Sequence, residues 1–238
     1  MVAITAEYLL NIKKNKDLAL KHIHMTTFSV KIISIQQVTH DVKCFRIEKP
    51  EGYKYTPGQA TDVSINKPGW ENETRPFTFT SLNSDAYLEF TIKRYNNVTN
   101  QLHQLVTGDE LMIRDVWGAI EYKGPGYFIA GGAGITPFIA ILRELHQQKK
   151  LDGNILFFSN KTAADIIYKD ELIHMLGENA RFILTREEKV HIDKAFLQAK
   201  IPDFNKHFYV CGPDKMIQDV NATLEELGVK SESLIFEK

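Results

Sequence analysis

The order of hydrophobic and polar residues divides the chain into two parts with different patterns. Between residues 27 and 116, apolar residues recur in short segments, and the segment 42–47 alternates well between apolar and polar positions, as half-buried strands do. The predicted strands span residues 28–35, 42–47, 60–65, 75–81, 87–93 and 110–114, and a short helix spans residues 99–106. Several short strands at close spacing favour a small antiparallel β-barrel.

The pattern changes at residues 124–126, where a Gly-Pro-Gly turn begins. Residues 127–130 form a continuous apolar run, which is typical of a strand buried on both faces of a parallel sheet. Further strands are predicted at residues 155–159, 181–185, 208–211 and 233–236, and helices at residues 137–148, 167–176, 192–199 and 214–227. Alternating strands and helices predict a doubly wound parallel sheet. The expected fold is therefore a two-domain α+β fold, with an antiparallel β-barrel over residues 27–123 and an α/β domain over residues 124–238.

Residues 1–26 have a different character from the rest of the chain. Their apolar positions fit a short amphipathic helix with lysines on the other side. We interpret this segment as a leader of uncertain structure. A helix that binds a membrane surface or a partner protein is the alternative interpretation.

Composition and charge narrow the function classes. The formal net charge of −1 lacks the excess of Lys and Arg that marks nucleic-acid binders. No apolar run is long enough to span a bilayer, and we find no secretory signal, so we expect no stable membrane insertion. The only two cysteines, Cys44 and Cys211, indicate a reducing, cytoplasmic setting, and they are too few for a plant-type iron–sulfur cluster. We expect a monomer, and we predict no metal site.

A glycine-rich loop, Gly-Gly-Ala-Gly-Ile-Thr-Pro at residues 131–137, lies where a buried strand turns into a helix. Glycines let a backbone approach a phosphate closely, and a helix N-terminus offers unpaired N–H groups. The loop is not a full Gly-x-Gly-x-x-Gly motif, so a tight turn without a ligand is the alternative.

A second loop, Cys211-Gly212-Pro213 with Met216 in the following helix, closes a later strand of the same predicted sheet. Ligands of doubly wound sheets bind at the carboxyl ends of the strands, so both loops are expected at the same functional edge. Cys211 alone also fits a small buried core residue.

The third motif, Arg75-Pro76-Phe77-Thr78, lies in the predicted barrel and by itself fits an ordinary strand. With the other two motifs, in this order and at this spacing, it resembles the ferredoxin–NADP reductase superfamily. Within that superfamily the chain is most similar to single-chain bacterial ferredoxin or flavodoxin reductases, over residues 27–238.

The resemblance assigns the motif residues of the barrel to a flavin. Arg75 would pair with the flavin pyrophosphate, and Pro76 belongs to the same motif. Phe77 would lie against the isoalloxazine ring, where the family often has tyrosine, and Thr78 would face flavin N5. These roles suit a guanidinium fork, an aromatic face and a hydroxyl that both donates and accepts. The flavin phosphate and ribityl chain would be lined by Ile92, Lys93 and Tyr95.

The loop that follows departs from the family pattern. Asn96 replaces a glycine, and Thr99, after Val98, replaces a serine. Thr99 keeps a hydroxyl at a helix N-terminus, which suits pyrophosphate binding. Asn tolerates a positive φ better than most residues, though less freely than Gly, so this departure bears on the shape of the loop more than on its function.

The α/β domain would bind the nicotinamide nucleotide. The resemblance assigns to this site Gly132, Gly134, Thr136, Cys211, Gly212, Pro213 and Met216. Cys211 would lie beside the nicotinamide, which makes Thr78 and Cys211 the candidate catalytic residues.

Side chains after the second strand of a dinucleotide fold usually select between NADH and NADPH. Ser159 and Lys161, joined by Arg186, are able to receive a 2′-phosphate, which favours NADPH slightly; a solvated loop lysine is the alternative. The resemblance places Tyr168 near the adenosine end.

The expected function is an FAD-dependent NAD(P)H oxidoreductase that passes electrons to a separate ferredoxin, flavodoxin or similar carrier. Two alternatives remain open: a reductase of free flavin or ferric complexes, and a non-catalytic docking subunit of a larger redox complex. An electron-transfer subunit of dihydroorotate dehydrogenase is disfavoured, because it would add cluster-binding cysteines.

Overall fold

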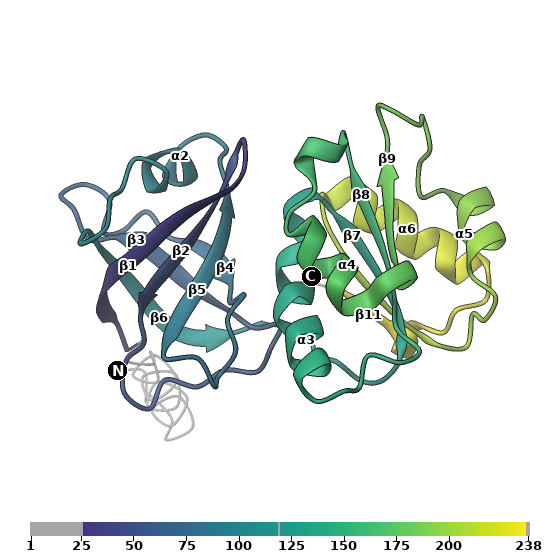
Figure 1. The fold of residues 1–238 in the computed structure, drawn as a ribbon, viewed down its shortest axis with the longest axis horizontal. Helices are drawn as coiled ribbons and strands as arrows, with labels where there is room; N and C mark the ends of the chain where they lie inside the picture. The colour runs from purple at the N-terminus through teal and green to yellow at the C-terminus, as the bar shows by residue number, and fades with distance from the viewer. Residues whose placement is uncertain (1–25, 119, 237–238) are drawn as a thin grey trace, which may run out of the picture.

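The computed structural model describes residues 26–118 and 120–236. The predicted leader therefore lies almost entirely outside the described residues. The described chain forms two sheets, an antiparallel one and then a parallel one, which lie side by side (Figure 1). None of the helices in the described ranges is both long and apolar enough to cross a membrane.

The first sheet has six antiparallel strands in the order β4-β3-β6-β1-β2-β5. Their bounds are β1 Phe28–Thr39, β2 Val42–Glu48, β3 Ala60–Ile65, β4 Arg75–Thr78, β5 Tyr87–Lys93 and β6 Glu110–Trp117. A bridge between Phe79 and Phe90 joins the outer strands, β4 and β5, and closes the sheet into a barrel. The closed form covers the unpaired edges that an open sheet would expose.

The barrel interior is filled by side chains that alternate inward along the strands. Phe45, Phe79 and Phe90 are fully buried there, and the Phe79 and Phe90 rings lie 5.2 Å apart. The short helix α2, Val98–Leu102, covers the barrel with Val98 and Leu102. These contacts hold β4 and β5 in place on the side of the barrel that faces the second sheet.

The second sheet has five parallel strands in the order β11-β10-β7-β8-β9. Their bounds are β7 Gly126–Gly131, β8 Ile155–Asn160, β9 Ala180–Leu184, β10 His207–Cys211 and β11 Leu234–Phe236. Every residue of β7 is buried, as its continuous apolar run predicts.

Helices cover both faces of this sheet. The helices are α3 Thr136–Gln147, α4 Lys169–Leu176, α5 Lys194–Lys200 and α6 Asp214–Glu226. Apolar residues of α3 and α4 pack into one core, and those of α5 and α6 pack into the core on the other face. The predicted two-domain fold is confirmed, with a β-barrel followed by a doubly wound α/β unit.

Some predicted element bounds differ from the structure. The first strand continues to Thr39 and the sixth to Trp117, whereas β4 already ends at Thr78. Helix α4 begins at Lys169 rather than at residue 167, because Tyr168 has a left-handed backbone with φ 53°. Such a residue cannot continue a right-handed helix toward its N-terminus.

Candidate functional site

Two neighbouring cavities lie between the barrel and the parallel sheet. The barrel-side cavity, of about 240 Å³, is lined on one side by strands β4 and β5 and on the other by the glycine-rich loop. The sheet-side cavity, of about 500 Å³, lies over the carboxyl ends of β7, β8 and β10. Both cavities are lined by Lys93, Tyr95, Ala133 and Gly134. Residues of the two domains therefore face one shared space.

The barrel motif reaches the barrel-side cavity with three of its four residues. Pro76, Phe77 and Thr78 line it, and the Phe77 ring packs 6.2 Å from the ring of Phe90. Arg75 stands at the exposed start of β4, outside the lining of both cavities, and its guanidinium donates to the Thr74 carbonyl at 2.7 Å. Antiparallel pairing with β3 holds this motif extended, so successive side chains point to opposite faces.

Strand β5 forms the neighbouring wall of the barrel-side cavity. Ile92 and Lys93 line it, together with Thr91, which belongs to none of the sequence motifs. The His103 ring nitrogen Nε2 lies 2.9 Å from the Ile92 carbonyl, and burial lowers the pKa of His103. The neutral ring can donate to that carbonyl and fix the end of β5.

The loop before α2 turns one residue after the position where the family has glycine. Asn97, not Asn96, has the positive φ, at 60°. Thr99 and Tyr95 line the cavity, and the Thr99 hydroxyl accepts the Tyr95 backbone N–H at 2.8 Å. The Val98 side chain is buried in the barrel core, so only its backbone remains for ligand contacts.

The glycine-rich loop forms a 3₁₀ turn over Gly132–Ile135 that leads directly into α3. Gly132 has φ 52°, a conformation that glycine adopts without strain. Gly134 is required for another reason, because a Cβ there would lie 2.4 Å from the Cys211 carbonyl oxygen. The Thr136 hydroxyl donates to the Ala133 carbonyl at 3.1 Å and closes the turn.

The loop after β10 packs against this turn. Cys211 is buried and lines the barrel-side cavity, while Gly212, Pro213 and Met216 line the sheet-side cavity. A Cβ added at Gly131 would lie 2.4 Å from the Met216 sulfur, which shows how closely the loops approach. The expectation that both loops meet at one edge of the sheet agrees with this packing.

The far end of the sheet-side cavity is polar. Ser159 and Lys161 line it, and the Arg186 backbone N–H donates to the Lys161 carbonyl at 3.0 Å. Asn160 also lines this cavity, and both polar atoms of its buried amide lack a hydrogen-bond partner among the described residues. Buried amides nearly always have a partner, so this one calls for a polar ligand or a water.

Tyr168, which the resemblance places near the adenosine end, lies at the contact between the domains. It lines neither cavity, and its hydroxyl lies 3.0 Å from the Thr91 hydroxyl of the barrel. The side chain therefore joins the α/β domain to the barrel.

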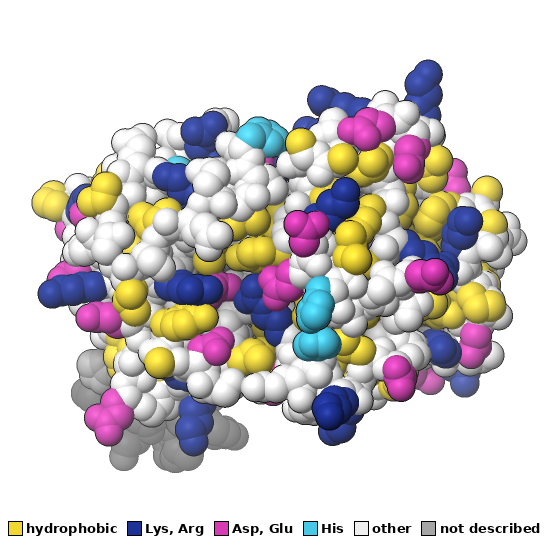
Figure 2. Space-filling view, viewed as in Figure 1, with side chains coloured by type: hydrophobic (Ala, Val, Ile, Leu, Met, Phe, Trp, Pro, Cys, Tyr) yellow, Lys and Arg dark blue, Asp and Glu magenta, His cyan; other side chains and the backbone are white. Residues whose placement is uncertain are grey.

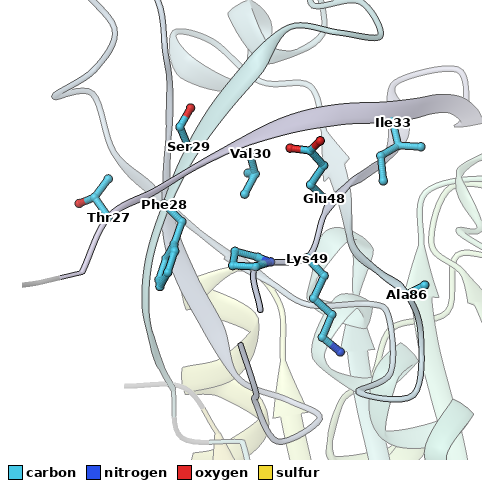
Figure 3. Close-up of a pocket in the computed structure, with 9 residues that line it drawn as sticks. Thr27, Phe28, Ser29, Val30, Ile33, Glu48, Lys49 and Ala86 are labelled. Carbon is cyan, nitrogen blue, oxygen red and sulfur yellow. The ribbon is translucent and has the colours of Figure 1, made fainter. Parts of the chain in front are cut away.

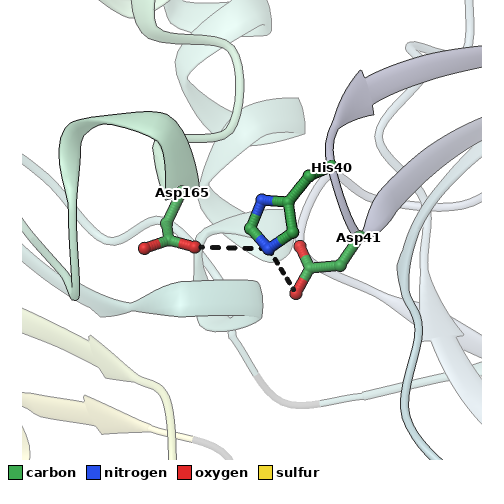
Figure 4. A group of neighbouring side chains, drawn as sticks. All are labelled: His40, Asp41 and Asp165. Carbon is green, nitrogen blue, oxygen red and sulfur yellow. Dashed lines mark ion pairs between the residues drawn. The ribbon is translucent and has the colours of Figure 1, made fainter.

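Charged side chains meet beside the cavities at a second point of the domain contact (Figure 4). His40 Nε2 lies 3.7 Å from an Asp41 oxygen and 3.9 Å from an Asp165 oxygen. Lys93 Nζ also lies 3.1 Å from Asp41, and the other Asp165 oxygen accepts from Thr162 at 2.7 Å. Because these carboxylates already have partners, we interpret the cluster as a polar contact between the domains.

Another hollow, of about 660 Å³, lies on the barrel away from these motifs (Figure 3). Its lining includes Phe28, Ile33, Glu48 and Lys49, and no residue of a glycine-rich loop. The surrounding surface gives no contrasting signal, because acidic and basic side chains are interspersed over the face shown in Figure 2. Compared with this hollow, the cleft combines glycine loops, an aromatic strand and polar cavity ends.

The comparisons with known proteins agree with this cleft. Residues 27–150 match the FAD-binding domain family, and residues 128–222 match the oxidoreductase NAD-binding domain family. The chain belongs to the FAD-binding family. Its parallel sheet matches a domain family that binds NAD in oxidoreductases, so both cavities lie within the matched residues.

Two relatives illustrate the range of proteins that the chain resembles. The chain is 25% identical over 233 residues to the reductase component of propane 2-monooxygenase from Rhodococcus jostii, covering 87% of this chain and 62% of the relative. It is 26% identical over 256 residues to NADH–cytochrome b5 reductase 1 from Arabidopsis thaliana, covering 97% and 90% of the two chains. The chain thus spans less than two thirds of the first relative.

Solved structures share the fold. A ferredoxin NADP⁺ reductase from Neisseria gonorrhoeae with bound FAD and NADP has a TM-score of 0.76 at 19% identity, over 89% of this chain and 98% of that one. The CS-b5R domains of human Ncb5or give a TM-score of 0.80 at 22% identity, over 92% and 71% of the two chains. At these identities the likeness concerns the fold alone.

The chain's own residues fit the two groups that the family binds. Backbone approach is possible at Gly132, where a Cβ would meet no atom within 4 Å. The unpartnered amide of Asn160 and the cation of Lys161 suit a polar, anionic ligand in the sheet-side cavity. The aromatic face of Phe77 and the hydroxyl of Thr78 suit a ring with polar atoms in the barrel-side cavity.

Proposed function

We propose that this protein oxidises NAD(P)H in the cleft and passes the electrons to a separate redox carrier such as a ferredoxin or flavodoxin. The supporting observation is the shared lining of the two cavities, where Lys93 and Tyr95 of the barrel face Ala133 and Gly134 of the nucleotide loop. A relative from Rhodococcus jostii is named as a reductase component of a monooxygenase, which supports a protein acceptor.

The barrel residues would bind and orient the flavin. Phe77 would supply an apolar face for the ring, and Thr78 a hydroxyl that donates or accepts a hydrogen bond. Arg75, the backbone at Val98 and the Thr99 hydroxyl would bind the pyrophosphate, with Arg75 leaving its contact to Thr74. Bound FAD supplies the chemistry that couples two-electron donors to one-electron carriers.

The residues of the α/β domain would hold the nucleotide with its nicotinamide toward Thr78. Gly132, Gly134 and Thr136 would receive the nucleotide phosphates at the start of α3, where backbone N–H groups are available. Cys211 would border the nicotinamide, because it lines the barrel-side cavity opposite the barrel motif. The close packing of the two loops would exclude water from this part of the cleft.

NADPH is the donor that the polar end of the sheet-side cavity favours. Lys161 lines the cavity and its carbonyl accepts from Arg186, so two cationic residues adjoin the end of β8. Glu187 lies nearby and accepts from the Ala163 backbone N–H at 3.0 Å, and its negative charge limits the preference for a 2′-phosphate.

We expect Lys161→Ala to lower kcat/KM for NADPH about tenfold with little effect on NADH, as loss of one charged contact predicts. A parent enzyme that prefers NADH, and is indifferent to the substitution, would contradict this.

The decisive experiment is an anaerobic titration of the purified protein. We expect a tightly bound flavin spectrum that bleaches on addition of NAD(P)H. Reoxidation is then compared with a ferredoxin, a flavodoxin, free flavin and a ferric complex as acceptors. Fast reoxidation by free flavin or ferric complex, with none by either protein, would favour the small-molecule reductase instead. A bound flavin that no nicotinamide nucleotide reduces would refute the proposed function.

A further inference from the structure

A partly buried ion-pair network joins the two domains at Arg143, in the second half of α3. One guanidinium nitrogen donates to the Glu89 carboxylate at 2.7 Å and to the Thr80 carbonyl at 2.6 Å, both in the barrel. The other two nitrogens donate to the two oxygens of Glu171, in α4, at 2.6 and 2.9 Å. One side chain thus ties two helices of the α/β domain to the barrel, with a bidentate geometry that lysine cannot reproduce.

Glu89 is the centre of the barrel side of this network. Its side chain is only 2% exposed, and its second oxygen accepts from Arg46 at 3.0 Å. The Thr80 hydroxyl donates at 3.0 Å to the first oxygen of Glu89, which is the oxygen that Arg143 contacts. Burial acts to raise the pKa of Glu89, but Arg143, Arg46 and Thr80 outweigh burial and lower the pKa. The carboxylate is ionised and depends on its partners, because a buried unpaired charge is strongly unfavourable.

Tyr168 makes a second connection beside the first. The Arg143 guanidinium lies over its ring at 5.1 Å, and its hydroxyl lies 3.0 Å from the Thr91 hydroxyl. Burial, Glu89 and Cys44 raise the pKa of Tyr168, so the phenol remains protonated. Its φ of 53° is unfavourable for a bulky residue, and such conformations persist where surrounding contacts hold them.

The network connects the two halves of the candidate site. Arg143 belongs to the helix that begins directly after the Gly132–Ile135 turn. On the barrel side, Thr80 lies two residues beyond Thr78, and Thr91 itself lines the barrel-side cavity. A shift of α3 against β5 would therefore move the nucleotide loop relative to Thr78.

We propose that Arg143 and Tyr168, with Glu89, Thr80, Thr91 and Glu171, form a latch that fixes the α/β domain against the barrel and so positions the nucleotide loop opposite Thr78. Neither Arg143 nor Tyr168 lines either cavity, so both are positioning residues. The consequence for hydride transfer rests on the proposed function, whereas the mechanical consequence does not. Near-attack geometry is sensitive to displacements of about 1 Å, which makes such a latch useful.

The sharpest test is Tyr168→Phe, which removes one hydroxyl and leaves the ring under Arg143. The matched control is Tyr53→Phe, because the Tyr53 hydroxyl donates to the Arg114 carbonyl at 2.6 Å entirely within the barrel. Hydrogen–deuterium exchange is measured on segments 80–91 and 136–147 of the flavin-loaded proteins. We expect Tyr168→Phe to increase exchange in both segments, and Tyr53→Phe to leave the 136–147 segment as in the parent.

The second readout is the limiting rate of flavin reduction at saturating NAD(P)H. We expect Tyr168→Phe to lower it about tenfold with unchanged affinity for FAD and nucleotide, and Arg143→Lys to lower it further, because lysine loses the fork. Exchange in Tyr168→Phe and Arg143→Lys that matches the parent would overturn the latch. Increased exchange with an unaltered reduction rate would overturn its positioning role. If NAD(P)H fails to reduce even the parent flavin, the proposed function is wrong, and the exchange comparison still decides the latch.

Discussion

We expect Gly134→Ala to impair nucleotide binding while flavin binding persists. A Cβ at Gly134 would lie 2.4 Å from the Cys211 carbonyl oxygen, and 2.5 Å from both the Cys211 carbonyl carbon and the Gly212 nitrogen. Ordinary van der Waals contact begins near 3.4 Å, so the loops must separate by about 1 Å. All three atoms belong to the backbone, so no rotamer change relieves the overlap.

The expected magnitude follows from this displacement. Overpacking a close contact costs about 1–3 kcal/mol, which converts to a loss of roughly 5- to 150-fold in an equilibrium constant. A 1 Å displacement near a reacting centre lowers rates by up to about 100-fold. We therefore expect kcat/KM for the preferred nucleotide to fall by about 10- to 100-fold. The barrel motif lies on the other domain, so the purified variant should retain its flavin, although Gly134 also lines the barrel-side cavity and its substitution can shift the flavin spectrum.

Two glycine substitutions serve as controls. Gly228→Ala, after α6 and outside both cavities, places a Cβ in open space but forces alanine to φ 90°, and Gly108→Ala does the same at φ 94° in a barrel loop. Each carries a conformational penalty of about 1–2 kcal/mol without a backbone clash. Urea unfolding and anaerobic nucleotide titration are measured on all three variants. Nucleotide affinity and kcat/KM within twofold of the parent for Gly134→Ala would refute the reasoning.

Three further predictions concern single side chains. Arg75→Ala should weaken FAD retention at least tenfold, since a charged hydrogen bond to phosphate contributes about 1.5–3 kcal/mol; equilibrium dialysis that finds parent-like retention would remove Arg75 from the site. Thr78→Ala should slow anaerobic flavin reduction about tenfold with an intact fold, and stopped-flow rates equal to the parent would exclude that role. The Glu89 pKa is lowered in the folded state from an ordinary value of 4.5, so its ionisation stabilises the fold above about pH 4.5 and this stabilisation is lost as the pH falls through the folded pKa. Urea unfolding from pH 7 to pH 3 should show a steeper loss in the parent than in Glu89→Gln, and identical slopes would contradict it.

The sequence by itself determined the order and type of most elements. Period-two segments became the barrel strands, and the all-apolar run at β7 became a buried parallel strand. The sequence also placed both glycine-containing loops at one edge of the sheet, because the carboxyl ends of parallel strands meet at the same edge. These features follow from local periodicity and from a general rule of topology, so no long-range contact had to be known.

The loop before α2 was decided by the tertiary structure. The motif comparison marked Asn96 as the replacement for the glycine, yet Asn97 carries the positive φ, because the Thr99 hydroxyl accepts the Tyr95 backbone N–H and the Val98 side chain packs into the barrel core. Both asparagines tolerate that conformation about equally. Their local propensities therefore do not distinguish the two positions, and packing does.

The sequence also did not predict which side chains form the contact between the domains. Arg143 and Glu89 are 54 residues apart, and Tyr168 and Thr91 are 77 apart. Arginine on an amphipathic helix and tyrosine before another are ordinary surface residues by pattern, and only the docking of the two sheets buries them together. Side-chain partners across such distances depend on how the domains pack, which periodicity and loop chemistry do not encode.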